Sequence, residues 1–221
     1  LGTVAAGSII HYLDDTEHNN LTHISTLQRI FPESYVWMDR FTMKNLELFN
    51  SNSINGFNLS DTIDETITSM GSRKLKSWIA FPLIDKKEIK KRQEIVKSII
   101  KNDDISNTLD IKLNNISDIE RLMSKIATYK ISPRELVNLK NSLENVSLIK
   151  DSLLVYSGVL KNYGKSLPNS KSIIGAISKT LKDDSPVSIL KGDFIKDGFS
   201  KELDGLRKIR FSGKEYLNQI L

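Results

Sequence analysis

The sequence contains no cysteine, which excludes disulfide bonds and thiolate metal sites and gives no sign of an oxidising compartment. It also lacks any apolar run close to the ~20 residues that a membrane-spanning helix needs, so we expect no membrane partner. Histidine is scarce: His11, His18 and His23 are separated by seven and five residues, not by the four of a helical zinc pair. We interpret these histidines as surface or boundary residues and predict no metal site.

Charge is plentiful but mixed in sign. The formal net charge is +5, from 32 lysines and arginines against 27 acidic residues. This balance permits contact with a phosphate backbone but does not require it, and the lysines are spread along the chain as on solvated helix faces. The 221 residues suffice for one domain or two small ones. Leu1 is not an initiator methionine and no signal peptide follows, so we expect a segment of a longer protein.

Most of the sequence carries apolar residues at three- and four-residue steps, the spacing that predicts amphipathic helices. The clearest helix start is at Ser132, with Pro133 at the first helical position and Glu135 where a capping box needs it. An apolar seam follows over residues 136–153. Further starts of the same kind are predicted at Asp85 with Glu88, at Ser117 with Glu120, and at Ser200.

One stretch departs from this helical pattern. Tyr35, Val36 and Trp37 favour a strand by side-chain type, so we predict a small β element over residues 35–49. We also predict that Trp37 and Trp78 are anchors of the core. Glycine and proline mark residues 183–197 as a linking segment before the last helix. The sequence thus predicts a mainly all-α fold, with a multi-helix core bundle and a long final helix.

Two features look like chemical motifs. Gly164-Lys165-Ser166 resembles the end of a phosphate-binding loop, but Val159 stands where such a loop needs glycine, so we interpret it as a chance match. Asp118, Glu120 and Arg121 form a charged cluster. We interpret this cluster as a capped helix start with surface or inter-helix salt bridges, because such clusters are common at helix N-termini. We therefore predict no catalytic residue and no cofactor within these residues.

The last predicted helix has a basic face. Its candidates for contact with DNA phosphates are Arg207, Lys208, Arg210 and Lys214. Such contacts would be independent of base sequence and strongly dependent on salt. The alternative is a solvated helix face that touches no nucleic acid. Gly213 lies inside this helix, where glycine is unfavourable by about 1 kcal/mol relative to alanine, and we expect either a hinge or a close helix contact there.

Several blocks, in this order and spacing, resemble the core domain of the MutS family of DNA mismatch repair proteins. They are Met38-Asp39 with Thr42 and Asn45-Leu46-Glu47-Leu48, IDETITSMGSRKL at residues 63–75 followed by Trp78-Ile79 and Pro82-Leu83, DIERL at 118–122, PREL at 133–136, and Gly198 with Glu202-Leu203-Asp204. The blocks cover nearly the whole chain. Lys125 departs from the family pattern, which often has arginine there, although the charge is kept.

The resemblance implies a helical core domain over residues 1–199 and a lever helix over residues 200–221 that leads toward a clamp domain. It also implies mechanical coupling between the DNA clamp and a distant ATPase, with ATP and magnesium bound elsewhere in the longer protein and no enzyme activity here. The implied partners are mismatched duplex DNA through the full-length protein, other repair proteins, and a second copy in a homodimer. The implied location is cytoplasmic and nucleoid-associated. A helical protein-interaction scaffold and a non-specific duplex-DNA-binding module remain as alternatives.

Overall fold

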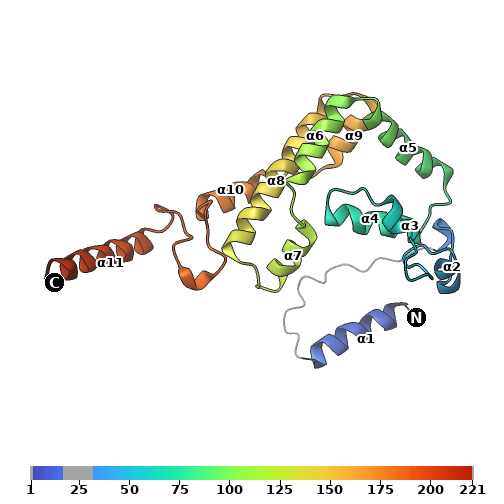
Figure 1. Ribbon diagram of the computed structural model, residues 1–221. Coiled ribbons are helices and arrows are strands. Elements are labelled where there is room, and N and C mark those ends of the chain that lie inside the picture. Colours follow the sequence, from blue (N-terminus) through green and yellow to red (C-terminus); the bar gives the residue numbers. More distant parts are fainter. Residues whose placement is uncertain (1, 17–31, 221) are drawn as a thin grey trace.

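The computed structural model describes residues 2–16 and 32–220. These residues form helices joined by loops, and no β-sheet occurs among them (Figure 1). The mainly all-α prediction is therefore confirmed. The helices are α1 (Gly2–Asp15), α2 (Arg40–Asn45), α3 (Leu59–Ile63), α4 (Ser69–Ala80), α5 (Lys86–Ile100), α6 (Asp103–Asn114), α7 (Ile119–Ala127), α8 (Pro133–Leu154), α9 (Gly158–Ser166), α10 (Lys171–Thr180) and α11 (Lys201–Ile220).

Helix α8 is the central helix of the packed body. It begins with the predicted capping box, in which Ser132 accepts from the Glu135 amide and Glu135 accepts from the Ser132 amide. Helices α6, α7, α9 and α10 all pack against it. A cluster of buried side chains lies where α6 and α9 meet its C-terminal half, and it contains Ile105, Ile149, Leu153 and Leu160. The seam predicted from the sequence thus lines a real core.

The crossing of α8 and α9 explains the motif at Gly164. This glycine is buried in α9, and a Cβ there would lie 2.9 Å from Cβ of Leu153 and 3.3 Å from the carbonyl oxygen of Lys150. Only a residue without a side chain allows the two backbones to come this close. Gly164 is therefore a packing residue, and the resemblance to a phosphate-binding loop is coincidental.

The helix caps of α5 and α7 differ in detail from those predicted from the sequence. Asp85 begins α5, but its carboxylate accepts from the amide of Lys87 at 2.7 Å, and Glu88 approaches Lys91 at 3.8 Å instead of closing a box. Helix α7 begins one residue later than predicted. Its cap is Asp118, whose carboxylate accepts from the Arg121 amide. The Ser117 amide donates instead to the Ser142 hydroxyl of α8 at 3.0 Å, so Glu120 does not close a capping box with it.

The small β element predicted over residues 35–49 is reduced to one antiparallel bridge between Tyr35 and Leu83. From Arg40 onward the chain is helical, because the Asp39 carboxylate accepts from the Thr42 amide at 2.7 Å and starts α2. The prediction that Trp37 and Trp78 anchor the core is wrong: they are 75% and 39% exposed. No residue of α4 or α5 is fully buried, so these helices provide no buried core against which the indoles could pack.

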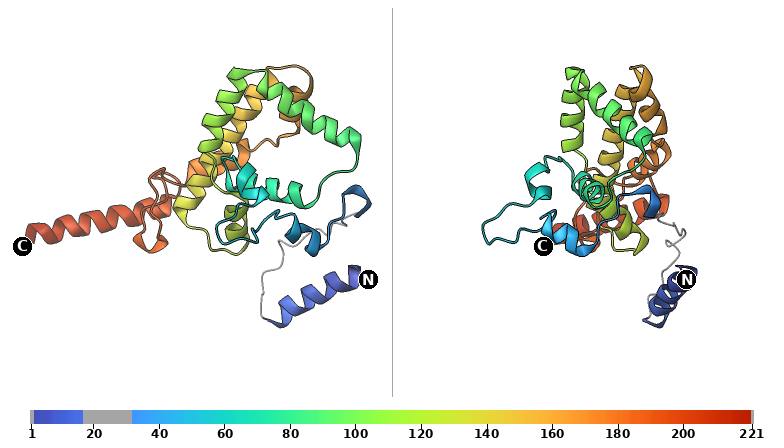
Figure 2. Two further views of the ribbon diagram at one scale, coloured as in Figure 1. Left: turned by 45° about the vertical axis from the view of Figure 1, so that its right-hand side comes forward. Right: turned by 90° about the vertical axis from the view of Figure 1, so that its right-hand side faces the viewer.

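The helices form a body from which α11 projects at one end, and α1 lies apart from the other helices (Figures 1 and 2). The apolar side chains of α1 are exposed, among them Val4, Ile9 and Tyr12. Within the described parts of the chain, none of the helices has the length and apolar content needed to cross a membrane.

Candidate functional site

A series of ion pairs runs through the molecule, and its first member joins α4 to α7. The guanidinium of Arg73 donates to both carboxylate oxygens of Asp118, at 2.7 and 2.8 Å, and to Glu120 at 2.6 and 2.9 Å. Asp118 also caps α7 by accepting from the Arg121 amide at 3.2 Å. The hydrogen bonds from Arg73 lower the pKa of Asp118 to about 2. The interpretation of this cluster as a capped helix start with inter-helix salt bridges is confirmed.

The second ion pair joins α7 to the start of α8. The Lys125 ammonium donates to Glu135, the same residue that closes the capping box of α8. The hydrogen bond from Lys125, together with that from the Ser132 amide at 2.9 Å, lowers the pKa of Glu135 to about 2. The charge of Lys125 therefore serves a specific contact between two helices.

Further along, α8 is fixed to the segment that follows α10. The Lys140 ammonium, which is almost buried, donates to Asp183 at 2.6 Å, and this contact lowers the pKa of Asp183. The Arg134 side chain donates to the carbonyl oxygen of Ser185 at 3.1 Å. Both donors come from the N-terminal half of α8. They hold residues 183–185, the start of the predicted linking segment, against α8.

The last contacts form a joint at the base of α11, which we define as Lys182, Asp193, Asp197, Asp204 and Arg207. Arg207 donates to Asp197 at 2.6 Å and to the carbonyl oxygen of Ile195 at 2.9 Å. Lys182 donates to Asp193 at 2.6 Å, which raises the pKa of Lys182 and lowers that of Asp193. Asp204 accepts from the amide of Gly198 at 2.9 Å. The base of α11 is thus tied to the preceding loop.

A backbone feature supports this joint. Gly198 has φ +83°, a conformation that residues with a side chain rarely adopt, and it lies three residues before the first residue of α11. The Ser200 hydroxyl then accepts from the Leu203 amide at 3.3 Å, as predicted for the start of the helix. The chain therefore turns sharply into α11 at a fixed point.

The four residues predicted to contact DNA all belong to α11. Arg207 is bonded within the joint, while Lys208 and Arg210 are exposed on α11. Lys214 belongs to α11, but its side chain lies outside the described residues. Contact between these residues and DNA remains a prediction. At Gly213 a Cβ would meet no described atom within 4 Å, so a close helix contact does not explain this glycine.

Sequence reasoning missed most members of the ion-pair series. Arg73 and Asp118 are 45 residues apart, and Lys140 and Asp183 are 43 apart, so no local spacing marks them as partners. Of the histidines, His11 is paired with Asp15 at 2.8 Å, while His18 and His23 lie outside the described residues. Among the residues that the structure describes, no group of three or more potential ligands could hold a metal ion.

These features define a class of protein segment: a packed helical body joined at a fixed point to one projecting helix. A family model described as MutS domain III matches residues 41–220, which include α2 to α11 apart from Arg40. Proteins named DNA mismatch repair protein MutS from Christiangramia forsetii and Flavobacterium johnsoniae are each 45% identical to this chain, over 100% and 99% of its length. One from Bacteroides fragilis is 41% identical over 99%. The chain belongs to the MutS domain III family, and it spans about a quarter of the length of these relatives.

Proposed function

We propose that this chain is the core and lever segment of a longer DNA mismatch repair protein. In this proposal residues 1–199 act as a stiff core, and residues 200–221 act as a lever whose displacement is transmitted through that core. The chain performs no chemistry, and ATP hydrolysis belongs to other parts of the longer protein. Mismatched duplex DNA is bound by the longer protein, which we propose acts as a homodimer with other repair proteins. The cytoplasmic, nucleoid-associated location is part of the same proposal.

The observation that carries this proposal is the continuous series of ion pairs from α4 to α11. Arg73 joins α4 to α7, and Lys125 joins α7 to α8. Lys140 then joins α8 to the segment after α10, and Lys182 and Arg207 tie the following loop to that segment and to α11. Coupling between distant sites requires a physically connected path that moves between discrete arrangements. The helices supply stiffness along the path, and the ion pairs favour the angles at which the helices meet in this arrangement.

The strength of these pairs suits such a role. Several acidic partners are largely exposed, among them Glu120 at 67%, Asp183 at 69% and Asp197 at 77%. Exposed ion pairs contribute little to stability, typically below about 1 kcal/mol. A joint of this kind can be rearranged at low cost while each arrangement keeps a defined geometry. We infer that the joint at Arg207 orients α11 without locking it.

The test measures the orientation of α11 directly. Because the chain has no cysteine, one pair of spin labels can be placed at Asn141→Cys on α8 and Ser212→Cys on α11, both exposed positions. We expect a single narrow distance distribution that broadens with Arg207→Gln. The control Lys208→Gln removes an equal charge from the neighbouring residue and should leave the distribution narrow. A broad distribution before any substitution at Arg207 would contradict the lever role.

A second candidate, a non-specific duplex-DNA-binding module, is favoured by the exposed positions of Lys208 and Arg210. Binding of the chain to duplex DNA with and without a mismatch, measured as salt is raised, separates the two. Weak, salt-sensitive and mismatch-independent binding would support phosphate contacts along the lever. No binding would favour the coupling role or a protein-interaction scaffold. A preference for mismatched DNA, or hydrolysis of ATP by this chain, would contradict the assignment to a core segment.

A further inference from the structure

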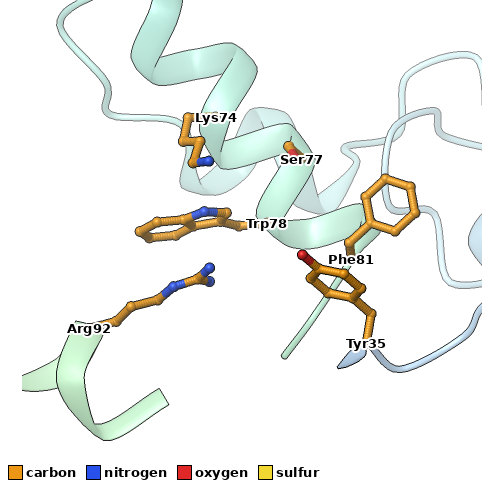
Figure 3. A pocket seen from close by; sticks show the side chains of 6 residues that line it. All are labelled: Tyr35, Lys74, Ser77, Trp78, Phe81 and Arg92. Atoms are coloured by element: carbon orange, nitrogen blue, oxygen red, sulfur yellow. The ribbon is translucent and has the colours of Figure 1, made fainter. Parts of the chain in front are cut away.

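A small recess lies between α4, α5 and the segment before α2. Its volume is about 190 Å³, and we call it the Trp78 pocket (Figure 3). The residues that line it are Tyr35, Lys74, Ser77, Trp78, Phe81 and Arg92. None of them belongs to the series of ion pairs described above. The pocket combines aromatic walls with two cationic side chains.

The backbone builds this pocket from three separate segments. Lys74, Ser77 and Trp78 lie at three- and four-residue steps on one face of α4. The Val36 amide donates to the Pro82 carbonyl at 2.8 Å, and this bond sets Tyr35 edge-on to the ring of Phe81, with ring centroids 5.9 Å apart. Figure 3 shows the Tyr35 hydroxyl directed toward Trp78. The pocket is therefore held in shape before any ligand arrives.

The charges of the pocket face an indole and not a carboxylate. The Arg92 guanidinium lies 4.0 Å from the centroid of the Trp78 ring, a cation–π contact. Figure 3 shows Lys74 on the other side of the same indole. No ion pair or hydrogen bond joins Lys74 or Arg92 to a carboxylate within the described residues. Two positive charges thus stand beside one recess without a balancing acid.

This arrangement selects among possible ligands. A nucleobase could not stack on Trp78 without displacing a cation from one of its faces, so base stacking of the kind that single-strand binders use is disfavoured. A guanidinium on one side of the indole and an ammonium on the other both favour an anionic ligand, and a guanidinium can donate two parallel hydrogen bonds to a carboxylate. The volume of about 190 Å³ accommodates one acidic side chain but not a run of phosphates. The pocket is shaped for an aspartate or glutamate side chain.

The surroundings point to protein and not to nucleic acid. Val36, Trp37 and Phe41 follow Tyr35 in the chain and are 46%, 75% and 76% exposed. Protein interfaces are enriched in aromatic residues and arginine, whereas DNA-binding surfaces are more polar and far more positively charged. A segment that covers this surface would place an acidic residue in the pocket and apolar residues beside Trp37. Its source must lie outside the described residues.

We propose that the Trp78 pocket holds an aspartate or glutamate side chain from another part of the same longer polypeptide, with apolar neighbours of that residue resting on Val36, Trp37 and Phe41. The relatives are about four times as long as this chain, so most of their length is available to supply such a segment. The inference rests on the proposal that the chain is part of a longer protein. It does not rest on the lever role of α11.

The experiment uses the longer protein and a carbodiimide, which joins an amine to an adjacent carboxylate without a spacer. We expect Lys74 to form a cross-link to an acidic residue outside these 221 residues, within one polypeptide, and mass spectrometry of the digest would identify it. Lys90, an exposed lysine of α5 that does not line the pocket, is the internal control. Cross-linking of Lys74 to a different polypeptide or to an acidic residue within these 221 residues, or no cross-link above the level at Lys90, would overturn the proposal.

A variant tests the role of the guanidinium. Arg92→Gln should reduce the yield of the Lys74 cross-link by about fivefold, the factor that corresponds to about 1 kcal/mol for an ion pair. Arg92→Lys should restore part of the yield because it restores the charge. Circular dichroism of both variants shows whether the helices are retained. An unchanged yield in a folded Arg92→Gln variant would overturn the proposal.

A phosphate probe completes the test. Acetylation of Lys74 in the longer protein should proceed at the same rate with and without inorganic phosphate. Protection of Lys74 by phosphate would overturn the proposal in favour of a phosphate ligand. If the purified native protein has only the mass of this chain, the proposed function fails first. If the protein is longer but Lys74 forms no specific cross-link, only this inference fails.

Discussion

Two regions of this molecule carry the same helical pattern but bury it very differently. Helix α8 has seven buried residues and is surrounded by α6, α7, α9 and α10. Helices α4 and α5 have apolar residues at the same three- and four-residue steps, yet neither has a fully buried residue. Apolar spacing therefore tells which face of a helix seeks a partner. It does not tell whether the partner lies in the same segment of chain.

The largest expected effect comes from emptying the core at α8. Ile149→Ala removes a side chain that is 7% exposed and should lower the free energy of unfolding by about 3 kcal/mol, because the surrounding helices cannot close the cavity. The matched change Ile100→Ala, at a residue 72% exposed at the end of α5, should cost less than about 0.5 kcal/mol. Urea unfolding of both variants measures the difference. Equal losses of unfolding free energy in the two variants would mean that α5 is as well buried as α8.

The second effect tests the close crossing of α8 and α9. Gly164→Ala places a Cβ against Leu153 and should destabilise the protein by about 1–2 kcal/mol. Gly175→Ala in α10 meets open space and should stabilise by about 1 kcal/mol, through helix propensity alone. Thermal unfolding followed by circular dichroism reports both. A stabilising Gly164→Ala would show that the two helices are further apart than described.

Local features of the fold could be predicted, because their causes are local. The helix start at Ser132 and Pro133 depends on residues within one turn, and the spacing of apolar residues in α8 is visible in the sequence itself. The fine position of a cap was less predictable. Ser117 was predicted as a cap, but its amide is bonded to Ser142, a residue 25 positions away. The competing contact could not be seen from the local sequence.

The candidate site was predictable only in part, for the same reason. Arg207 was singled out as basic and accessible, yet its acidic partners precede it in a loop whose shape depends on Gly192 and Gly198. Arg73 lies inside a block that resembles the MutS family, but nothing in that block indicates Asp118 as its partner. Trp37 was assigned to the core by residue type alone. Side-chain type predicts burial on average, and it fails on a surface that the chain itself does not cover.

A third effect is the pH dependence of the stability that the ion pair between Arg73 and Asp118 contributes. The pKa of Asp118 is lowered to about 2 by Arg73, whereas in the unfolded chain it lies near 4. A lowered folded-state pKa means that this contribution to stability is fully present above about pH 4 and is lost as the pH falls toward 2. Arg73→Gln should therefore be less stable than the unsubstituted chain at pH 7, and the difference should shrink between pH 4 and pH 2.

The control for this experiment is Arg40→Gln, which removes an exposed arginine of α2 outside the ion-pair series. Its small effect should not change over the same pH interval. Urea midpoints at pH 7, 4, 3 and 2.5 provide the comparison. A difference between Arg73→Gln and the unsubstituted chain that stayed constant down to pH 2.5 would show that Arg73 acts through packing and not through charge.

The smallest expected effect is also the one that bears most directly on the contrast between the two regions. Trp37→Ser removes a large aromatic side chain that is 75% exposed, and it should change the free energy of unfolding of this chain by less than about 0.5 kcal/mol. Truncating a buried tryptophan typically costs 3–5 kcal/mol, roughly ten times as much. Urea unfolding of the chain gives this value. A loss above about 2 kcal/mol would mean that Trp37 is covered within the chain itself, and the surface beside the Trp78 pocket would then need no outside partner.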